Sequence, residues 1–189
     1  MLVPNEDDVI NRHDIGAQGL LLDWEQGKAA LQRLHASPYQ FGYEPAGSRY
    51  HDLLRLAQRW CSYATLVMQD FRWTGHALAA AEELRPWHAA DVSSLEWPGT
   101  QVLKAAKVMV FRFEAASADV LGRLARRLYQ WEQPDLPEDL CLFRPTGEPW
   151  LVSIAHESDG WVNVTRDELP AVAEAIRPLP LKFRRRSLR

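Results

Sequence analysis

The chain has 189 residues, of which 47% are hydrophobic and 25% are charged, and its net charge is −3. These proportions are those of an ordinary globular domain and exclude a disordered or fibrous protein. No apolar run approaches the roughly 18 to 20 residues that cross a bilayer, and the first residues are acidic where a signal peptide is basic. We therefore expect a soluble cytoplasmic protein without a membrane segment.

The cysteine and tryptophan content restricts the expected class of protein further. Cys61 and Cys141 lie far apart in apolar segments, whereas a disulfide scaffold is denser in cysteine and a zinc site usually contains close Cys or His pairs. We therefore expect two buried free thiols in a reducing compartment, with no metal and no other cofactor. The chain also contains eight tryptophans, whose large rings anchor both protein cores and interfaces.

The expected domain organisation is a single domain with two flanking segments. Residues 1–16 are polar and acidic and predict an N-terminal arm, residues 17–181 predict one α+β domain, and residues 182–189 predict a basic tail. No internal repeat and no glycine-rich linker divides the chain. The expected architecture is N-terminal helices followed by a mainly antiparallel sheet and a C-terminal helix.

The first half of the sequence is mainly helical in its pattern of apolar residues. Helical spacing predicts helices over residues 20–35 and 48–60, and an alanine-rich composition predicts a helix over 76–84 that Pro86 ends. The segment 37–48 carries aromatic rings among prolines and glycines, which is typical of a loop or of a short edge strand. The apolar run 63–67 is either the end of the second helix or a buried strand, and periodicity leaves both open.

The middle of the chain contains three further predicted elements. A loop is expected over residues 87–99, where tryptophans stand among polar residues and a Pro-Gly pair. The run 104–113 is rich in valine and phenylalanine and predicts a strand. An amphipathic helix is expected over 117–131, with Ser117 as its N-cap.

The C-terminal third has the clearest pattern. Three apolar runs separated by turn residues predict an antiparallel meander over 140–143, 150–156 and 161–164. Thr165 and Glu168 have the spacing of a capping box, which predicts the start of a final helix. This helix should end before Pro178.

The strongest local candidate for catalysis is the group His156, Glu157 and Asp159 near a predicted hairpin turn. The sequence contains none of the familiar nucleotide-loop, zinc-protease or serine-hydrolase motifs. An imidazole beside carboxylates is nevertheless a suitable general base. Adjacent residues of a strand point to opposite faces, so His156 and Glu157 share a site only if a turn or bulge intervenes. The alternative is that Asp159 begins the turn and His156 merely ends the strand.

The other histidines and the two cysteines are weaker candidates for a functional site. His51, His76 and His88 form a second set that the fold could gather with Asp70 or Asp91. Their spacing matches no metal-binding motif, so we expect no metal site there. The two cysteines lie in apolar runs, which favours inert thiols over nucleophiles.

The end of the chain is strongly basic. Residues 182–189 carry five positive charges, which leaves a net charge of −8 on the remainder. Arg184, Arg185 and Arg186 are therefore candidates for contacts with nucleic acid, with an acidic partner or with the protein's own acidic surface. The pI of about 6.1 makes a nucleic-acid-binding domain the less favoured interpretation.

The C-terminal third also carries a resemblance to known proteins. The pattern from Asp139 to Glu157, followed by Trp161-Val-Asn-Val-Thr-Arg-Asp-Glu-Leu, resembles segments of small uncharacterised bacterial proteins. Some of these resemble immunity proteins, which neutralise polymorphic toxins. The resemblance implies a stoichiometric binder, and an acidic surface suits a basic target such as a nuclease because complementary potentials raise the association rate.

Three hypotheses on function follow from the sequence. The first is a non-enzymatic protein-binding module of the immunity type, whose candidate anchors are Tyr39, Phe41, Tyr43, Trp87, Trp97, Trp150 and Trp161. The second is a small hydrolase or transferase that uses His156, Glu157 or Asp159. The third is a regulatory protein that binds nucleic acid through its tail. A protein partner is expected but not identified, and the oligomeric state stays open.

Overall fold

The fold is built on one large antiparallel sheet. The computed structural model describes residues 35–69 and 72–184, which form eight strands and four α-helices. The strand order is β3-β4-β2-β5-β6-β7-β1-β8, and all seven neighbouring pairs are antiparallel. The predicted α+β class with a mainly antiparallel sheet is therefore confirmed.

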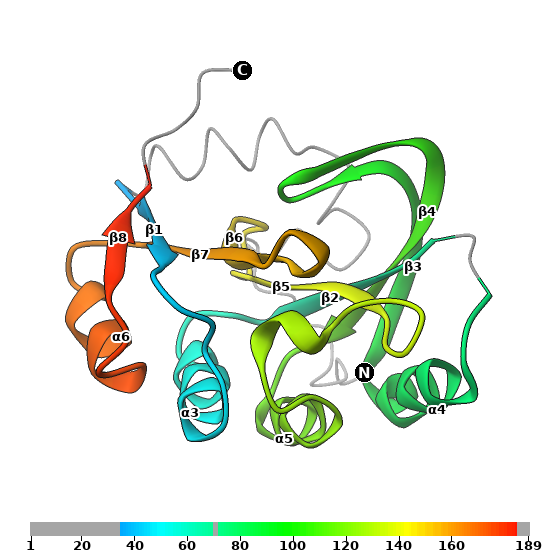
Figure 1. Cartoon of the computed structure of the whole chain (residues 1–189), viewed down its shortest axis with the longest axis horizontal. Coiled ribbons are helices and arrows are strands. Elements are labelled where there is room, and N and C mark those ends of the chain that lie inside the picture. Colours follow the sequence, from blue (N-terminus) through cyan, green and yellow to red (C-terminus); the bar gives the residue numbers. More distant parts are fainter. Residues whose placement is uncertain (1–34, 70–71, 185–189) are drawn as a thin grey trace, which may run out of the picture.

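The helices are interspersed among the strands along the described chain. The strands are β1 (Ser37–Phe41), β2 (Tyr63–Met68), β3 (His88–Trp97), β4 (Thr100–Arg112), β5 (Glu138–Phe143), β6 (Pro149–Ile154), β7 (Asp159–Val164) and β8 (Leu181–Phe183). The α-helices are α3 (Ser48–Ala57), α4 (Gly75–Leu84), α5 (Ala115–Leu124) and α6 (Leu169–Ala175). The first two match the helices predicted over 48–60 and 76–84. Figure 1 shows the four helices on one face of the sheet.

Strand β5 is buried on both faces, and this position organises the core. Leu140 and Leu142 belong to the large apolar cluster on the helix side, whereas Cys141 and Phe143 belong to a second cluster. Alternate residues of a strand point to opposite faces, so the second cluster lies on the face away from the helices. Burial on both faces accounts for the four consecutive apolar residues 140–143 of this strand.

The β3–β4 hairpin curves over the face of the sheet that lies opposite the helices (Figure 1). Gly99 stands in its turn with a φ of +87°, a conformation that glycine adopts without strain. A Cβ atom at this position would come within 2.8 Å of Ile154 and 2.9 Å of Trp161. The hairpin turn therefore packs directly on the ends of β6 and β7, and only glycine fits there.

The prediction of a loop over residues 87–99 is wrong, because residues 88–97 form β3. Serine, aspartate and alanine are weak strand formers, so the local composition favoured a loop. The strand forms because β4 pairs with it along most of its length. β4 itself begins at Thr100 rather than at residue 104, since the same pairing extends it.

The helix predicted over residues 117–131 is shorter than expected. α5 ends at Leu124, and Ser117, the predicted N-cap, lies inside its first turn. Beyond α5, backbone groups of residues 126–128 form hydrogen bonds and a β-bridge with residues 45–47. These bonds to a distant segment replace the helical bonds that the local pattern predicted.

The C-terminal third agrees best with the prediction. β5, β6 and β7 form the expected antiparallel meander, and α6 ends before Pro178. Glu168 Oε2 accepts a hydrogen bond from the Thr165 N–H at 3.0 Å, which is one half of the predicted capping box. The helix itself begins at Leu169, and Glu168 also accepts two hydrogen bonds from the buried Arg144 at 2.8 and 2.7 Å.

The order of elements in the first half differs from the prediction. Among the described residues, β1 precedes the first helix, so the helices do not all come before the sheet. The arm predicted over 1–16 lies outside the described residues, as does the helix predicted over 20–35 except for its last residue. Segment 37–48 begins with β1, which is paired on both sides and is not an edge strand. The run 63–67 belongs to the buried strand β2.

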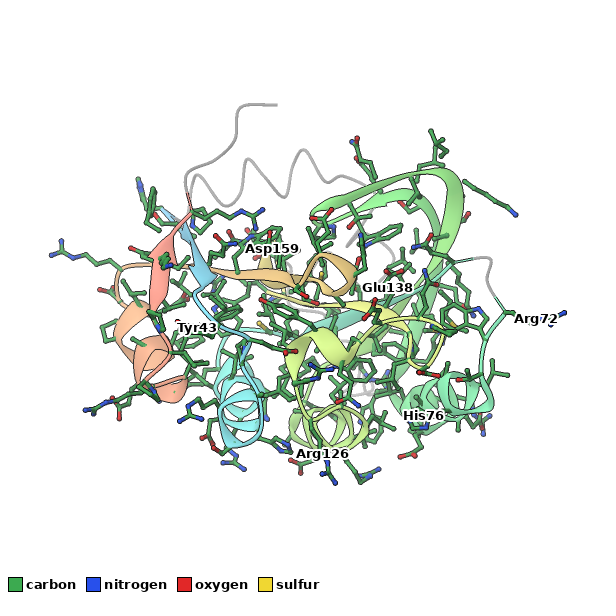
Figure 2. The ribbon with its side chains drawn as sticks, in the orientation of Figure 1. Tyr43, Arg72, His76, Arg126, Glu138 and Asp159 are labelled. Atoms are coloured by element: carbon green, nitrogen blue, oxygen red, sulfur yellow. The ribbon has the colours of Figure 1, made fainter. Side chains whose placement is uncertain are left out.

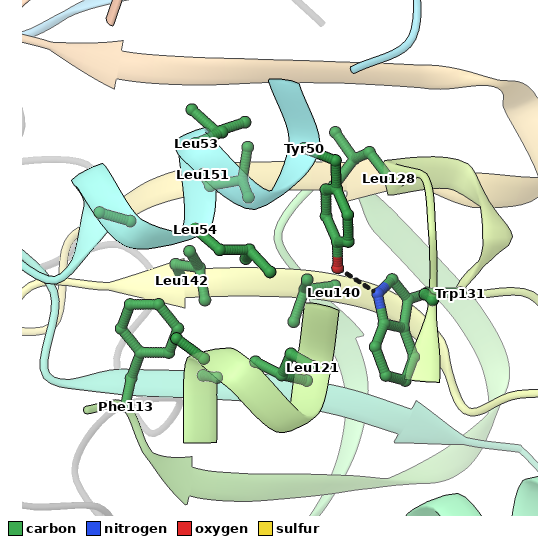
Figure 3. Close-up of a cluster of buried hydrophobic side chains, with 14 of the residues drawn as sticks. Tyr50, Leu53, Leu54, Phe113, Leu121, Leu128, Trp131, Leu140, Leu142 and Leu151 are labelled. Atoms are coloured by element: carbon green, nitrogen blue, oxygen red, sulfur yellow. Dashed lines mark hydrogen bonds between the residues drawn. The ribbon is translucent and has the colours of Figure 1, made fainter. Parts of the chain in front are cut away.

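A hydrogen bond between two aromatic residues lies at the centre of the helix-side core. Trp131 Nε1 donates to Tyr50 Oη at 2.7 Å, and both side chains are fully buried among leucines (Figure 3). An indole N–H that is removed from water needs a protein acceptor. Tyr50 on α3 supplies it, which fixes the helix against the segment that follows α5.

Both cysteines are buried and free, as predicted. Burial raises the pKa of Cys61 and of Cys141, so both thiols stay protonated at neutral pH and are weak nucleophiles. None of the described helices is long and apolar enough to cross a membrane.

Replacing Tyr50 with phenylalanine should lower the free energy of unfolding by about 1 to 3 kcal/mol, because the buried Trp131 N–H loses its acceptor. Urea unfolding measures this change. Tyr43→Phe is the matched control, since it removes the same hydroxyl from a ring that is 70% exposed, and it should cost less than about 0.5 kcal/mol. Equal losses in the two variants would contradict the role given to the Tyr50 hydroxyl.

Candidate functional site

Two adjacent carboxylates, Glu138 and Asp139, begin strand β5 in the protein interior. Their residues are only 2% and 0% exposed. Burying a charged group is costly unless other polar groups satisfy it. The environment of these two side chains therefore indicates where the described residues concentrate polar chemistry.

Asp139 accepts hydrogen bonds from two other parts of the fold. Its Oδ1 accepts from the backbone N–H of Ala155 at 2.8 Å. Its Oδ2 accepts from the indole N–H of Trp97 at 2.8 Å and from the Thr100 hydroxyl at 3.4 Å. Asp139 thus connects the turn of the β3–β4 hairpin to the 3-10 turn η4 (Ala155–Glu157) that follows β6.

Burial raises the pKa of Asp139 from 3.8 to about 6, because loss of water disfavours the charged carboxylate. The hydrogen bonds from Trp97 and Ala155 act in the opposite direction. The nearby carboxylate of Glu138 raises the pKa further, whereas His156 lowers it. Asp139 is therefore a carboxyl group that changes protonation at mildly acidic pH.

Glu138 holds the ring of His156 from inside the protein. His156 Nδ1 lies 3.0 Å from Glu138 Oε1, and Gln69 Nε2 donates to Glu138 Oε2 at 2.7 Å. The side chain of His156 is 43% exposed, whereas that of Glu138 is 3% exposed. An imidazole held at one nitrogen by a buried carboxylate has its other nitrogen, Nε2, in position to exchange a proton with a ligand.

The turn η4 allows the side chains of His156 and Glu157 to share one site. These residues lie in a 3-10 turn rather than in an extended strand, and Ser158 follows with a φ of 51°. His156 Nε2 therefore comes within 4.0 Å of Glu157 Oε1. Both side chains belong to the same exposed turn, so the predicted pair does come together.

The third predicted member, Asp159, does not join this pair. Asp159 Oδ1 accepts a hydrogen bond from Gln40 Nε2 at 2.8 Å, and Asp159 Oδ2 lies 3.0 Å from a guanidinium nitrogen of Arg184. Figure 2 shows Asp159 and Glu138 at separate positions along the sheet. The predicted group of three is therefore corrected to His156 and Glu157, joined by the buried Glu138.

Sequence reasoning missed Glu138 and Asp139 as site residues. The available signal was a pair of acidic residues directly before the apolar run of β5. Such residues are ordinarily solvated at the start of a strand. Only the packing of the hairpin and of η4 around them places both carboxylates in the interior.

Within the described parts of the chain, Glu138, Asp139 and His156 are the group whose donor atoms come close enough to share a metal ion, all within 4.8 Å of one another. Carboxylates and imidazole are ligands that several divalent metals accept. The carboxylate oxygens already accept the hydrogen bonds described above, so a metal ion would have to displace donors such as Gln69 or Trp97. The geometry favours a hydrogen-bonded cluster over a metal centre.

The second histidine set is not gathered by the fold. His51 lies on α3 and His76 on α4, whereas His88 begins β3. His88 Nε2 lies 2.9 Å from Asp91 Oδ1, as part of an exposed pair. Asp70 lies outside the described residues.

The seven aromatic residues predicted as partner anchors differ in exposure. Three are buried core residues: Phe41, Trp97 and Trp150. Three are partly buried: Tyr39, Trp87 and Trp161. Tyr43 is exposed (Figure 2). The buried rings stabilise the interior, so a surface contact can draw only on the remaining four.

The basic tail begins differently from the prediction. Lys182 and Phe183 belong to β8, which pairs with β1. Arg184 is engaged by the protein itself, through Asp159 and through the ring of Trp161. Arg185 and Arg186 lie outside the described residues. One of the three arginines proposed for nucleic-acid contacts is therefore already bound to the acidic surface of the protein.

Comparisons of the chain with protein-family models, with curated proteins and with solved structures find no match. The candidate functions below rest on the residues and contacts of this chain.

The pKa of Asp139 predicts a pH dependence of stability. Because the pKa of the folded state, about 6, lies above the unfolded value of 3.8, the folded state binds this proton more tightly. The Asp139 contribution to the free energy of unfolding should therefore be largest below pH 4 and should fall by about 3 kcal/mol as pH rises through 6.

Carbon-13 NMR of the Asp139 carboxyl group measures the pKa directly, and urea unfolding between pH 4 and 7 measures the free energy. Asp135→Asn is the control for the unfolding series, because Asp135 is exposed and its loss should leave the slope unchanged. A carboxyl resonance that titrates near pH 4 would refute the assignment.

Proposed function

We propose that this protein is a non-enzymatic protein-binding module and that the β3–β4 hairpin forms its binding surface. The observation that carries the proposal is the exposure of Leu95 and Leu103 on this hairpin. Leu95 is 55% exposed and Leu103 is fully exposed. Together with Val102, Glu96 and Gln101 they line one shallow hollow of about 410 Å³. Single exposed leucines are ordinary, but an apolar patch on one hairpin is typical of an interaction surface.

The edge position of β3 supports the same proposal. β3 lies at one end of the sheet, so its outer backbone groups face away from the other described strands. It is ten residues long and contains neither proline nor lysine, and its edge protection consists of two register shifts and the charges of Asp91 and Glu96. β8, at the other end, is only three residues long and includes Lys182. A partner strand can therefore add to β3 and cover the leucines beside it.

An immunity-type inhibitor of a bacterial toxin is the specific form of this proposal. The resemblance of the C-terminal third supports it, as does the net charge of −8 on the chain without residues 182–189. An acidic inhibitor associates faster with a basic target. The expected partner is a basic protein such as a nuclease, bound stoichiometrically in the cytoplasm.

A small hydrolase or transferase is the second candidate, and the Glu138–His156 pair favours it. A buried carboxylate at Nδ1 orients an imidazole for proton transfer at Nε2, as in many hydrolytic sites. This candidate stands second because Asp159, its third predicted member, is committed to Gln40 and Arg184.

Serine replacements on the hairpin test the first candidate. Tagged wild-type protein should retain one stoichiometric partner from its own cells, and Leu95→Ser and Leu103→Ser should each weaken retention by about tenfold because a buried leucine contributes roughly 1.5 to 3 kcal/mol. Leu78→Ser is the matched control, since Leu78 on α4 is 54% exposed. Circular dichroism confirms that the variants fold. Equal retention by all four proteins, or no partner for any of them, would reject the hairpin surface.

Substrate screening tests the second candidate. Wild-type protein, His156→Gln and Glu138→Gln should be compared on chromogenic acyl, phosphoryl and glycosyl esters. If His156 is a general base, both variants lose about 100-fold in rate. His76→Gln is the control, because His76 is an exposed histidine on another element. Turnover that is absent, or that survives His156→Gln, would remove this candidate.

A further inference from the structure

Three side chains on β1 and β7 form a compact cluster that we call the guanidinium site: Gln40, Asp159 and Trp161. Gln40 and Trp161 are register partners on the two strands, and Asp159 lies two positions before Trp161 on the same face of β7. Gln40 Nε2 donates to Asp159 Oδ1 at 2.8 Å. This bond orients the carboxylate and directs its other oxygen, Oδ2, to a second donor.

Arg184 supplies that second donor. Its guanidinium carbon lies 3.7 Å from the centre of the Trp161 ring, and one of its terminal nitrogens lies 3.0 Å from Asp159 Oδ2. A flat aromatic face and a carboxylate are the two partners that best recognise an arginine side chain. The guanidinium site is therefore an arginine-binding site by its chemistry, and in this structure the chain's own Arg184 fills it.

The site and its occupant are held by different parts of the fold. β7 pairs with β6 and with β1, so the walls of the site belong to the body of the sheet. Arg184 follows β8, an edge strand with three register pairs to β1, and its backbone N–H donates to the Pro38 carbonyl at 2.9 Å. The side chain of Arg184 can therefore leave the site while its backbone and the walls stay in place.

Arg184 also fits the site incompletely. Its second terminal nitrogen is buried and has no hydrogen-bond partner. A buried donor without an acceptor weakens the binding of the group that carries it. An arginine that approaches with its own neighbouring acceptors, as in a peptide, would satisfy more of its guanidinium donors.

The guanidinium site lies next to the surface proposed for partner binding. The hairpin turn at Gly99 packs on the edge of the Trp161 ring, at 2.9 Å from the position of a Cβ atom. A protein that covers the hairpin therefore reaches Trp161 as well. The acidic net charge of the chain without residues 182–189 favours association with a basic partner.

We infer that Gln40, Asp159 and Trp161 bind an arginine side chain of the protein partner and that Arg184 occupies this site in the free protein. The inference rests on the proposed function only in naming a protein partner as the source of the arginine. Binding of the partner exchanges one arginine for another, and it releases the Arg184 side chain from Asp159 and Trp161.

Calorimetry with N-acetyl-arginine-amide tests the inference on the full chain. Arg184→Ala empties the site and should bind this probe, whereas the wild type should bind it about tenfold more weakly because its own Arg184 competes at high effective concentration. Adding Asp159→Asn to Arg184→Ala should weaken binding by about tenfold again. Arg126→Ala, which removes an exposed arginine on another segment, should behave as the wild type.

N-acetyl-citrulline-amide is the matched ligand, because it has the shape of arginine without the charge, and it should not bind. If Arg184→Ala does not fold, Arg184→Met is used in its place, because methionine keeps the aliphatic stem of the side chain. On the wild type, excess arginine probe should shift the indole N–H resonance of Trp161, assigned by its absence in Trp161→Phe.

Equal binding of the two probes, or no binding to either Arg184 variant and no shift in the wild type, would overturn the inference. If the wild type is a dimer and Arg184→Ala is a monomer, the arginine that fills the site comes from a second copy of the chain. This outcome would overturn the assignment to a different protein partner. The small probe needs no protein partner, so this result is independent of the leucine variants of the hairpin.

Discussion

Burial of strand β5 on both faces is the constraint on which the rest of the structure depends. Four consecutive apolar residues in its run leave no polar face, so the strand is stable only when both sides are covered. The helices cover one side. On the other side, β3 and β4 contribute Ala90 and Val110 to the same cluster as Phe143. The curved hairpin is therefore part of the core and also the most protruding part of the sheet.

The polar cluster is a consequence of the same arrangement. Glu138 and Asp139 begin this strand and are buried because the hairpin and the turn η4 pack around them, so each needs donors from other segments. Gln69 at the end of β2, Trp97 in the hairpin and the turn after β6 supply them. The carboxylates thus connect three segments, and the cost of burying Asp139 appears as its raised pKa.

The buried polar cluster and the exposed features of the hairpin suit different functions, catalysis in the first case and protein binding in the second. Glu138 and Asp139 are buried and hydrogen-bonded to their neighbours, whereas the side chain of His156 is 43% exposed. The leucines of the hairpin are exposed, and the hairpin turn at Gly99 packs on Trp161, which is one wall of the partly buried guanidinium site. Two neighbouring surface features of different chemistry, one apolar and one anionic, are what a specific protein interface requires. For this reason the protein-binding proposal ranks above the enzymatic one.

The sequence by itself determined the elements that depend on neighbouring residues. Turn residues and apolar runs predicted the meander of β5 to β7, helical spacing predicted α3, alanine-rich composition predicted α4, and the apolar runs around the cysteines predicted the buried thiols. Tertiary structure alone decided that residues 88–97 form a strand, that α5 ends at Leu124, and that Asp139 meets Trp97. These outcomes depend on hydrogen bonds between segments distant along the chain, which leave no periodic pattern in the local sequence. The same holds for Arg184, whose charge was evident but whose partners on β7 only the folded sheet brings within reach.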